Sequence, residues 1–167
     1  MQNKNEWLQR LTGQLYEGVL TDEGWSEALR TISQVTDSPQ ASVVVFDTQS
    51  QTLAINESFG TVQEAVAAYN AHYHRLDDAL AWASRAPLVG GWYLDRRDLG
   101  EAAMRRSEYY QDFMLRYGMA SALCNRVAGD GGMDAYLSLQ RRPGQPHYSD
   151  AELAAFGQFI PHVQRAV

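Results

Sequence analysis

Two pairs of short strand-like runs, each joined by a turn, most constrain the fold of this 167-residue chain. The first pair is 41–48 (ASVVVFDT) and 53–59 (LAINESF), separated by a polar turn. The second pair lies within 119–141, on either side of Gly-Asp-Gly-Gly at 129–132, which is a strong hairpin signal. Because hairpins join antiparallel neighbours, we predict an antiparallel sheet rather than a parallel, doubly wound one.

A further strand and two opening helices are also visible in the pattern. The segment 90–95 (GGWYLD) suits a strand. Before the first hairpin, apolar residues recur twice at helical spacing, as Leu8, Leu11, Leu15 and Val19, and then as Trp25, Ala28, Leu29 and Ile32. The chain therefore begins with two helices.

More helices are predicted between and after the strands, over 61–76, 77–86, 107–118 and 149–167. Two of them start with a capping-box pattern, Thr61 with Glu64 and Ser149 with Glu152. Together these patterns predict an α+β fold, in which an antiparallel sheet of about five strands is flanked by helices.

Composition excludes several functional classes. The chain has 14 basic and 20 acidic residues and a formal net charge of −6, so it is a poor binder of nucleic-acid phosphates. Cys124 is the single cysteine, which excludes disulfides within the chain and favours a reducing compartment. No apolar signal core opens the sequence and no apolar run is long enough to span a membrane. We therefore expect a cytoplasmic protein that does not bind membranes.

Motifs that carry catalysis or bind metals are missing from the sequence. His72 and His74 lie two residues apart in a predicted helix, where they point to different faces, and neither His147 nor His162 belongs to an HExxH motif. There is no GxSxG, GxGxxG or phosphate-loop pattern. We predict no metal site, no cofactor and no catalytic residue, and hence a protein that is not an enzyme.

The segment 69–117 is dense in aromatic residues: Tyr69, Tyr73, Trp82, Trp92, Tyr93, Tyr109, Tyr110, Phe113 and Tyr117. Buried Tyr and Trp side chains need hydrogen-bond partners, so this many polar-tipped rings indicate a cavity for a small molecule. The alternative is that the rings only pack helices onto the sheet. Periodicity leaves both interpretations open.

Three segments carry a resemblance to a known family: YNAHYHRLD at 69–77, RSEYYQDF at 106–113 and FIPHVQRAV at 159–167. They resemble the N-terminal sensor region of LuxR-type bacterial transcription regulators. The resemblance implies a GAF- or PAS-like α/β/α sandwich that precedes a DNA-binding helix-turn-helix. It predicts a ligand-sensing domain over 1–148 and a connecting or dimerisation helix over 149–167, with DNA bound only by a domain outside this chain.

The resemblance also suggests a ligand site. In the autoinducer-binding branch of the family, an aromatic helix, an Asp-Pro and a later Trp surround an acylated lactone. Asp77 and Trp92 resemble the later Asp and Trp, but Asp78 replaces the proline and no Trp lies on the helix of Tyr69. We therefore predict an unidentified small molecule, bound by Tyr69, Tyr73, Asp77, Trp82, Trp92, Tyr110 and Phe113. Asp77 has a competing role as N-cap of the helix that follows it.

The last helical pattern has its own seam, since Leu153, Phe156, Ile160, Val163 and Val167 alternate at spacings of three and four. Such a seam suits a homodimer, or it packs on the chain's own sheet. Pro161 predicts a bend at Gly157. The leading hypothesis is a sensory domain of a transcription regulator; the alternative is a ligand-free dimerisation or protein-interaction module.

Overall fold

The computed structural model describes residues 4–18, 21–85, 91–129 and 131–167. Its strands are β1 (Gln40–Asp47), β2 (Thr52–Phe59), β3 (Trp92–Leu94), β4 (Ser121–Gly129) and β5 (Met133–Arg141). Its helices are α1 (Lys4–Gly18), α2 (Asp22–Thr36), α3 (Gln63–Ala71), η1 (Tyr73–Leu76), α4 (Asp78–Ala83), α5 (Asp95–Asp98), α6 (Glu101–Met104), η2 (Tyr109–Met114), α7 (Asp150–Phe156) and α8 (Ile160–Ala166). The predictions that fall on Val19, Ala86, Gly90 and Asp130 lie outside the described residues.

The strands form one antiparallel sheet in the order β2-β1-β5-β4-β3. The predicted hairpins are β1–β2 and β4–β5, and they join through the antiparallel pairing of β1 with β5. The predicted α+β class, with a five-stranded antiparallel sheet flanked by helices, is confirmed. Strands that are far apart in the sequence therefore pair in the middle of the sheet.

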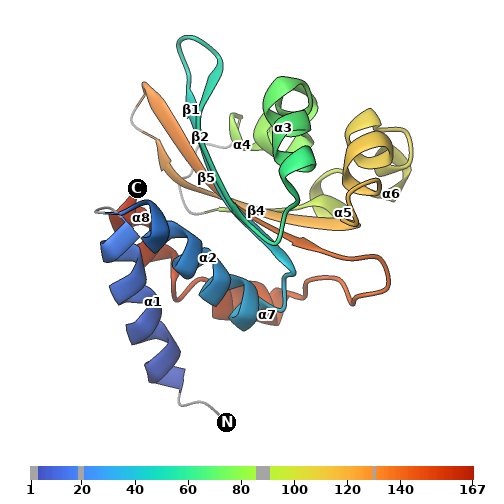
Figure 1. Cartoon of the computed structure of the whole chain (residues 1–167). Helices are drawn as coiled ribbons and strands as arrows, with labels where there is room; N and C mark the ends of the chain where they lie inside the picture. Colours follow the sequence, from blue (N-terminus) through green and yellow to red (C-terminus); the bar gives the residue numbers. More distant parts are fainter. Residues whose placement is uncertain (1–3, 19–20, 86–90, 130) are drawn as a thin grey trace.

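Helices cover both faces of the sheet (Figure 1). α1, α2, α7 and α8 lie on one face, while α3, α4, α5 and α6 lie on the other. Alternation along β5 supplies both layers, because Leu137 and Leu139 face the first set of helices and Tyr136 and Ser138 face the second. The molecule is an α/β/α sandwich with a separate core on each side of the sheet.

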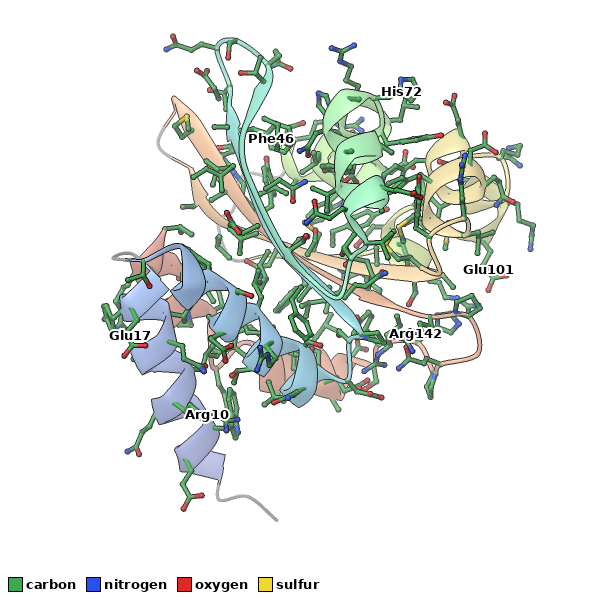
Figure 2. The ribbon with its side chains drawn as sticks, viewed as in Figure 1. Arg10, Glu17, Phe46, His72, Glu101 and Arg142 are labelled. Atoms are coloured by element: carbon green, nitrogen blue, oxygen red, sulfur yellow. The ribbon has the colours of Figure 1, made fainter. Side chains whose placement is uncertain are left out.

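The two cores differ in composition. The aliphatic core, under α1, α2, α7 and α8, is built mainly from Leu, Ile and Val: Leu11, Leu15, Leu29, Ile32, Val43, Leu123, Val127, Leu137, Leu139, Leu153, Phe156, Phe159, Ile160 and Val163. The aromatic core, on the other face, contains Val44, Ala65, Tyr69, Ala79, Ala83, Tyr93, Tyr109, Tyr110, Phe113, Met114, Met119, Ala122, Cys124 and Tyr136. Figure 2 shows Phe46, whose ring packs against the aromatic core from β1.

Some predicted helices are interrupted. The helix expected over 61–76 ends at Ala71 and is followed by a 3-10 turn, η1. Its predicted capping box is wrong, because Val62 is the N-cap residue and no side chain caps α3. The capping box of Ser149 and Glu152 is confirmed at the start of α7. α5 and α6 were not predicted, since each is a single turn too short for a periodic pattern.

The terminal segment is two helices instead of one. α7 ends at Phe156, and α8 begins at Ile160 with Pro161 in its first turn, where proline is tolerated. Among the predicted seam residues, Val167 is 46% exposed, whereas the others lie in the aliphatic core: Leu153, Phe156, Ile160 and Val163. These residues pack on the chain's own sheet and helices and are not a free dimerisation face. The segment 149–167 completes the core of the domain.

Arg141, at the end of β5, ties these layers together. Its side chain is 3% exposed and donates to the carbonyl oxygen of Thr36 at 2.9 Å and to Glu152 Oε1 at 2.7 Å. The guanidinium also lies 4.0 Å from the ring centroid of Tyr148. A buried cation is stable only with such a complete set of partners.

Within the described residues, no helix has the length and apolarity to cross a membrane.

Candidate functional site

Asp77 is the centre of the polar groups in the aromatic core. It is 7% exposed and lies between η1 and α4, where its Oδ1 accepts a hydrogen bond from the backbone N–H of Ala79 at 2.9 Å. Its Oδ2 accepts from the hydroxyls of Tyr69 at 2.9 Å and Tyr109 at 3.2 Å. Asp77 therefore has the predicted role of N-cap of α4, and it also joins α3 to η2.

The environment of Asp77 changes its acidity. Burial raises the pKa of the carboxyl from 3.8 to about 6, although the hydrogen bonds from Tyr69, Ala79 and Tyr109 act to lower it. Burial, together with the nearby Asp77 carboxylate, raises the pKa of both tyrosines well above the usual value. The phenols therefore remain protonated donors, while the carboxyl can be neutral or ionised close to neutral pH.

A small cavity of about 40 Å³ lies beside Asp77, between the sheet and the helices. Its helical side is formed by Ala65, Val66, Tyr69, Tyr109 and Phe113. Its sheet side is formed by Ser42, Val44, Asn56, Ser58, Ser138 and Gln140. The space holds only about one or a few water molecules, so the aromatic core is largely filled in this state.

A wider groove of about 440 Å³ borders Asp77 from another direction. It is lined by Phe46, Asp47, Thr48, Gln51, His74, Arg75, Leu80, Ala81, Ser84, Asp134 and Tyr136, in addition to Asp77. Asp77 is shared by the cavity and the groove. This carboxylate is therefore the point at which a molecule in the groove comes within reach of the aromatic core.

A π-helix supplies two rings of the cavity. The N–H of Leu115 donates to the carbonyl of Tyr110 and that of Met119 to Met114, both five residues earlier. The wider turn buries two adjacent pairs of side chains, Tyr109 with Tyr110 and Phe113 with Met114. π-Helical turns are rare and are frequent at functional sites.

The hydroxyl of Tyr110 bonds to a second buried carboxylate, which lies away from the cavity. Asp95 accepts hydrogen bonds from the backbone N–H of Ala122 at 2.6 Å, that of Arg96 at 2.7 Å and the hydroxyl of Tyr110 at 3.3 Å. It is fully buried, and burial raises its pKa to about 6. This group ties β4 and η2 to the end of β3.

The structure brings together most of the predicted site residues. Tyr69, Asp77 and Phe113 line the cavity. Tyr73 stacks on Phe113 with ring centroids 4.9 Å apart, behind the cavity wall. Trp82 packs on Tyr93 at 5.5 Å, so it belongs to the aromatic core without lining the cavity, and Tyr110 also lies outside the lining.

Trp92 is not brought to this site. It packs at the edge of the aliphatic core, with its ring 6.4 Å from that of Phe156. Successive side chains of a strand point to opposite faces, and in β3 it is Tyr93 that faces the aromatic core. Placing Trp92 with the cavity residues is therefore wrong, and Tyr93 occupies that side of the sheet.

Sequence reasoning missed several lining residues. Tyr109 adjoins Tyr110 in the sequence, and only the π-helical turn turns its ring toward Asp77. The polar floor, Ser42, Asn56, Ser58, Ser138 and Gln140, was also missed. A signal was present, because Ser42 and Ser138 interrupt otherwise apolar strand runs.

Other reactive side chains are engaged in ordinary contacts. The imidazole of His72 lies 3.0 Å from Glu108 Oε1, and His74 Nδ1 lies 3.0 Å from the carbonyl oxygen of Tyr69. Burial raises the pKa of the Cys124 thiol to about 12, which keeps it protonated and poorly nucleophilic. Among the described residues, no group of three or more His, Cys, Asp and Glu side chains is arranged to hold a metal ion.

Comparison with known proteins finds similarity of structure only, since no protein-family model and no curated protein sequence matches the chain. The LBD domain of VqsR from Pseudomonas aeruginosa matches at a TM-score of 0.70 and 18% identity, over 95% of this chain and 92% of that one. CepR2 from Burkholderia cenocepacia, an N-acylhomoserine lactone dependent LuxR family transcription factor, matches at 0.71 and 12% identity, over 98% and 92%.

A GAF domain is also similar, that of the Acinetobacter phosphoenolpyruvate-protein phosphotransferase, at a TM-score of 0.62 and 14% identity over 99% of this chain and 93% of that one. At these identities the similarity establishes the fold. The resemblance predicted from the sequence is confirmed at that level: the chain has the fold shared by LuxR-family sensor domains and GAF domains.

Proposed function

We propose that this chain is a non-catalytic sensory domain of a LuxR-type transcription regulator, which binds a small molecule beside Asp77. The observation that carries the proposal is the buried carboxylate that accepts from both Tyr69 and Tyr109 and borders both the cavity and the groove. An apolar site with a few directed polar groups is the usual character of a small-molecule site. DNA is bound, in this proposal, by a separate domain outside these residues.

The contacts of Asp77 suggest how occupancy is transmitted. A ligand donor that bonds Asp77 competes with the hydroxyls of Tyr69 and Tyr109, which belong to α3 and η2. The cavity of about 40 Å³ is too small for a ligand of drug size, so these elements move apart on binding. Binding then favours an open arrangement over a closed one by the difference between the affinities of the two states.

The relatives support a ligand-binding role without identifying the ligand. CepR2 is described as dependent on N-acylhomoserine lactones. Asp78 follows Asp77 here, where the autoinducer-binding branch has proline. We therefore propose a small molecule that bonds Asp77, whose identity has to be found by screening.

The experiment is a thermal-shift screen of the purified chain against a metabolite library, repeated with Asp77→Asn and with the control Asp112→Asn. Asp112 is an exposed carboxylate on η2, so its variant changes charge without touching the cavity. We expect ligands that raise the melting temperature of the native chain and of Asp112→Asn, but less that of Asp77→Asn. The proposal fails if the whole library produces no shift, or if all three proteins respond equally.

A second candidate function is a ligand-free interaction module, and one surface favours it. Ile55, Met133 and Val167 are exposed large apolar side chains around a groove of about 590 Å³ on the aliphatic-core side of the sheet. Exposed apolar patches commonly mark protein contacts. Light scattering of the native chain and of Ile55→Glu distinguishes this candidate, which requires an associated species that the substitution dissociates.

A further inference from the structure

The floor of the cavity contains a row of serines that crosses three strands. Ser42 of β1 is directly opposite Ser58 of β2 and directly opposite Ser138 of β5, and Ser138 is opposite Cys124 of β4. Side chains of directly opposed residues lie on the same face, about 5 Å apart. Ser42, Ser58 and Ser138 all line the cavity, and we call them the serine row.

The other face of the same strands contrasts with the serine row. Val43, Leu137 and Leu139 alternate with these serines and are buried in the aliphatic core. Both faces are covered by helices (Figure 1), so apolar residues would be expected on each. The three serines are half-buried, and polar groups are costly to bury further unless they are hydrogen-bonded. No hydrogen bond among the described residues engages the hydroxyl of Ser42 or Ser58, so each is free to bond a guest.

The remaining lining extends this chemistry. On the sheet side, Asn56 and Gln140 add amide groups, and Val44 is the apolar exception. Thr61 adds another hydroxyl. The cavity lining contains no Lys, Arg or His, so nothing there neutralises an anion. Aromatic rings form the roof, and they match the flat carbon faces of a compact ring compound.

On the basis of the proposed function, we infer that the ligand is a compact molecule without negative charge, rich in hydroxyl or amide groups, held between the serine row and the aromatic roof, and not a molecule with a long acyl chain. An acyl chain on this floor would leave the hydroxyls of Ser42 and Ser58 without a ligand partner. Sites built to hydrogen-bond a substrate discriminate strongly against analogues that lack the bonding groups. A polyol, a sugar or a cyclic amide satisfies these hydroxyls and also offers a donor to Asp77.

The test compares two probe panels of equal size on the full chain, by thermal shift followed by calorimetry. One panel contains neutral polyols, sugars and small amides such as myo-inositol, N-acetylglucosamine and nicotinamide. The other contains N-butanoyl-, N-octanoyl- and N-dodecanoyl-homoserine lactones, fatty acids and monoacylglycerols. We expect stabilisation by members of the first panel only.

Variants then locate the contact. The double substitution Ser42→Ala with Ser138→Ala removes two floor hydroxyls and should weaken a polar hit by roughly tenfold or more. The matched control is Ser26→Ala with Ser50→Ala, two exposed serines of α2 and the β1–β2 turn, which should leave the affinity unchanged. Circular dichroism checks that both double variants are folded.

The outcomes separate this inference from the proposed function. Stabilisation by acyl compounds alone, or a polar hit that the floor variant binds as well as the native chain does, overturns the inference and leaves a sensory domain in place. No stabilisation by either panel overturns the inference, whereas the proposed function falls only if the metabolite-library screen also produces no shift.

Discussion

The hydroxyl of Tyr69 donates to Asp77 Oδ2 at 2.9 Å, and this buried bond joins α3 to the N-cap of α4. Removing the hydroxyl leaves one acceptor position of the carboxylate unfilled. We predict that Tyr69→Phe lowers the free energy of unfolding by about 1.5 kcal/mol, as measured by urea denaturation. Tyr16→Phe, at a residue that is 49% exposed, should change it by less than about 0.5 kcal/mol. Equal effects would show that the bond contributes nothing specific.

Acid should affect this protein through its buried carboxyl groups. Burial raises the pKa of Asp77 and of Asp95 from 3.8 to about 6. Between these values the folded state holds protons that the unfolded state has released, so each group's stabilising contribution is complete below about pH 4 and is lost as the pH rises through about 6. The slope per group approaches 1.4 kcal/mol per pH unit, roughly.

The measurement is the difference between the native chain and Asp77→Asn in urea unfolding across this pH range. The difference isolates one carboxyl from groups such as Asp47, whose pKa is lowered by backbone hydrogen bonds and whose effect has the opposite sign. We expect the native chain to lose stability relative to the variant as the pH rises. Parallel pH profiles would contradict the assigned titration.

Arg141 should contribute strongly to the stability of the fold. Arg141→Met removes the charge that lies between Thr36, Glu152 and Tyr148, so that Glu152 Oε1 and the Thr36 carbonyl lose their guanidinium donor and the Tyr148 ring loses its cation. We predict a loss of about 3 kcal/mol or more in chemical denaturation. The neighbouring Arg142 is exposed, so Arg142→Met is the matched control and should be nearly neutral. A small effect at Arg141 would show that an apolar methionine stabilises the fold about as well as the buried ion pair does.

Two glycines with a left-handed backbone conformation allow the two costs of an alanine substitution to be measured separately. One cost is steric overlap of the new Cβ, and the other is strain of the backbone. Gly60 has φ +76° and Gly144 has φ +87°, so an alanine at either pays a similar strain of about 1 kcal/mol. A Cβ at Gly60 would overlap the carbonyl oxygen of Pro39, whereas a Cβ at Gly144 meets nothing within 4 Å. We expect Gly60→Ala to cost roughly 2 kcal/mol more than Gly144→Ala in thermal unfolding. Similar melting temperatures would contradict the close approach at Gly60.

The final helix provides a test of where its apolar seam packs. Val163 is fully buried in the aliphatic core and Val167 is 46% exposed. Val163→Ala should cost about 2 kcal/mol at every protein concentration, because its partners belong to the same chain. Val167→Ala should be nearly neutral. If the loss at Val163 instead varied with protein concentration, with a change in molar mass by light scattering, the seam would be an interface between copies.

Local signals were enough to predict the sheet, because a hairpin is specified by a turn and its two flanking strands. The polar turn and the glycine-rich turn identified β1–β2 and β4–β5, and the pairing of β1 with β5 completes the sheet between them. The aromatic segment and Asp77 were also found from sequence. These features depend on neighbours that are close along the chain.

The errors concern features that depend on distant partners. β3 contains three residues, which is too short for alternation to decide whether Trp92 or Tyr93 faces the aromatic core. The spacing of Tyr109, Tyr110, Phe113 and Met114 also fits an α-helix, so the π-helical turn could not be recognised. The serine row emerges only from strand register, since its members are far apart in sequence.

The strand order also determines when this domain can fold during its synthesis. β1 is synthesised early, yet one of its two hydrogen-bonded neighbours is β5, which is synthesised much later. The pairing of Val44 with Tyr136 in the middle of the sheet therefore forms only after β5 has been made. Until then Val43 and Val45 remain on a strand that has β2 on one side and an unpaired edge on the other. A nascent chain stalled before β5 would expose that edge, which is a template for aggregation. Chaperones that hold extended apolar segments should therefore bind ribosome-bound fragments of this chain until β5 has emerged.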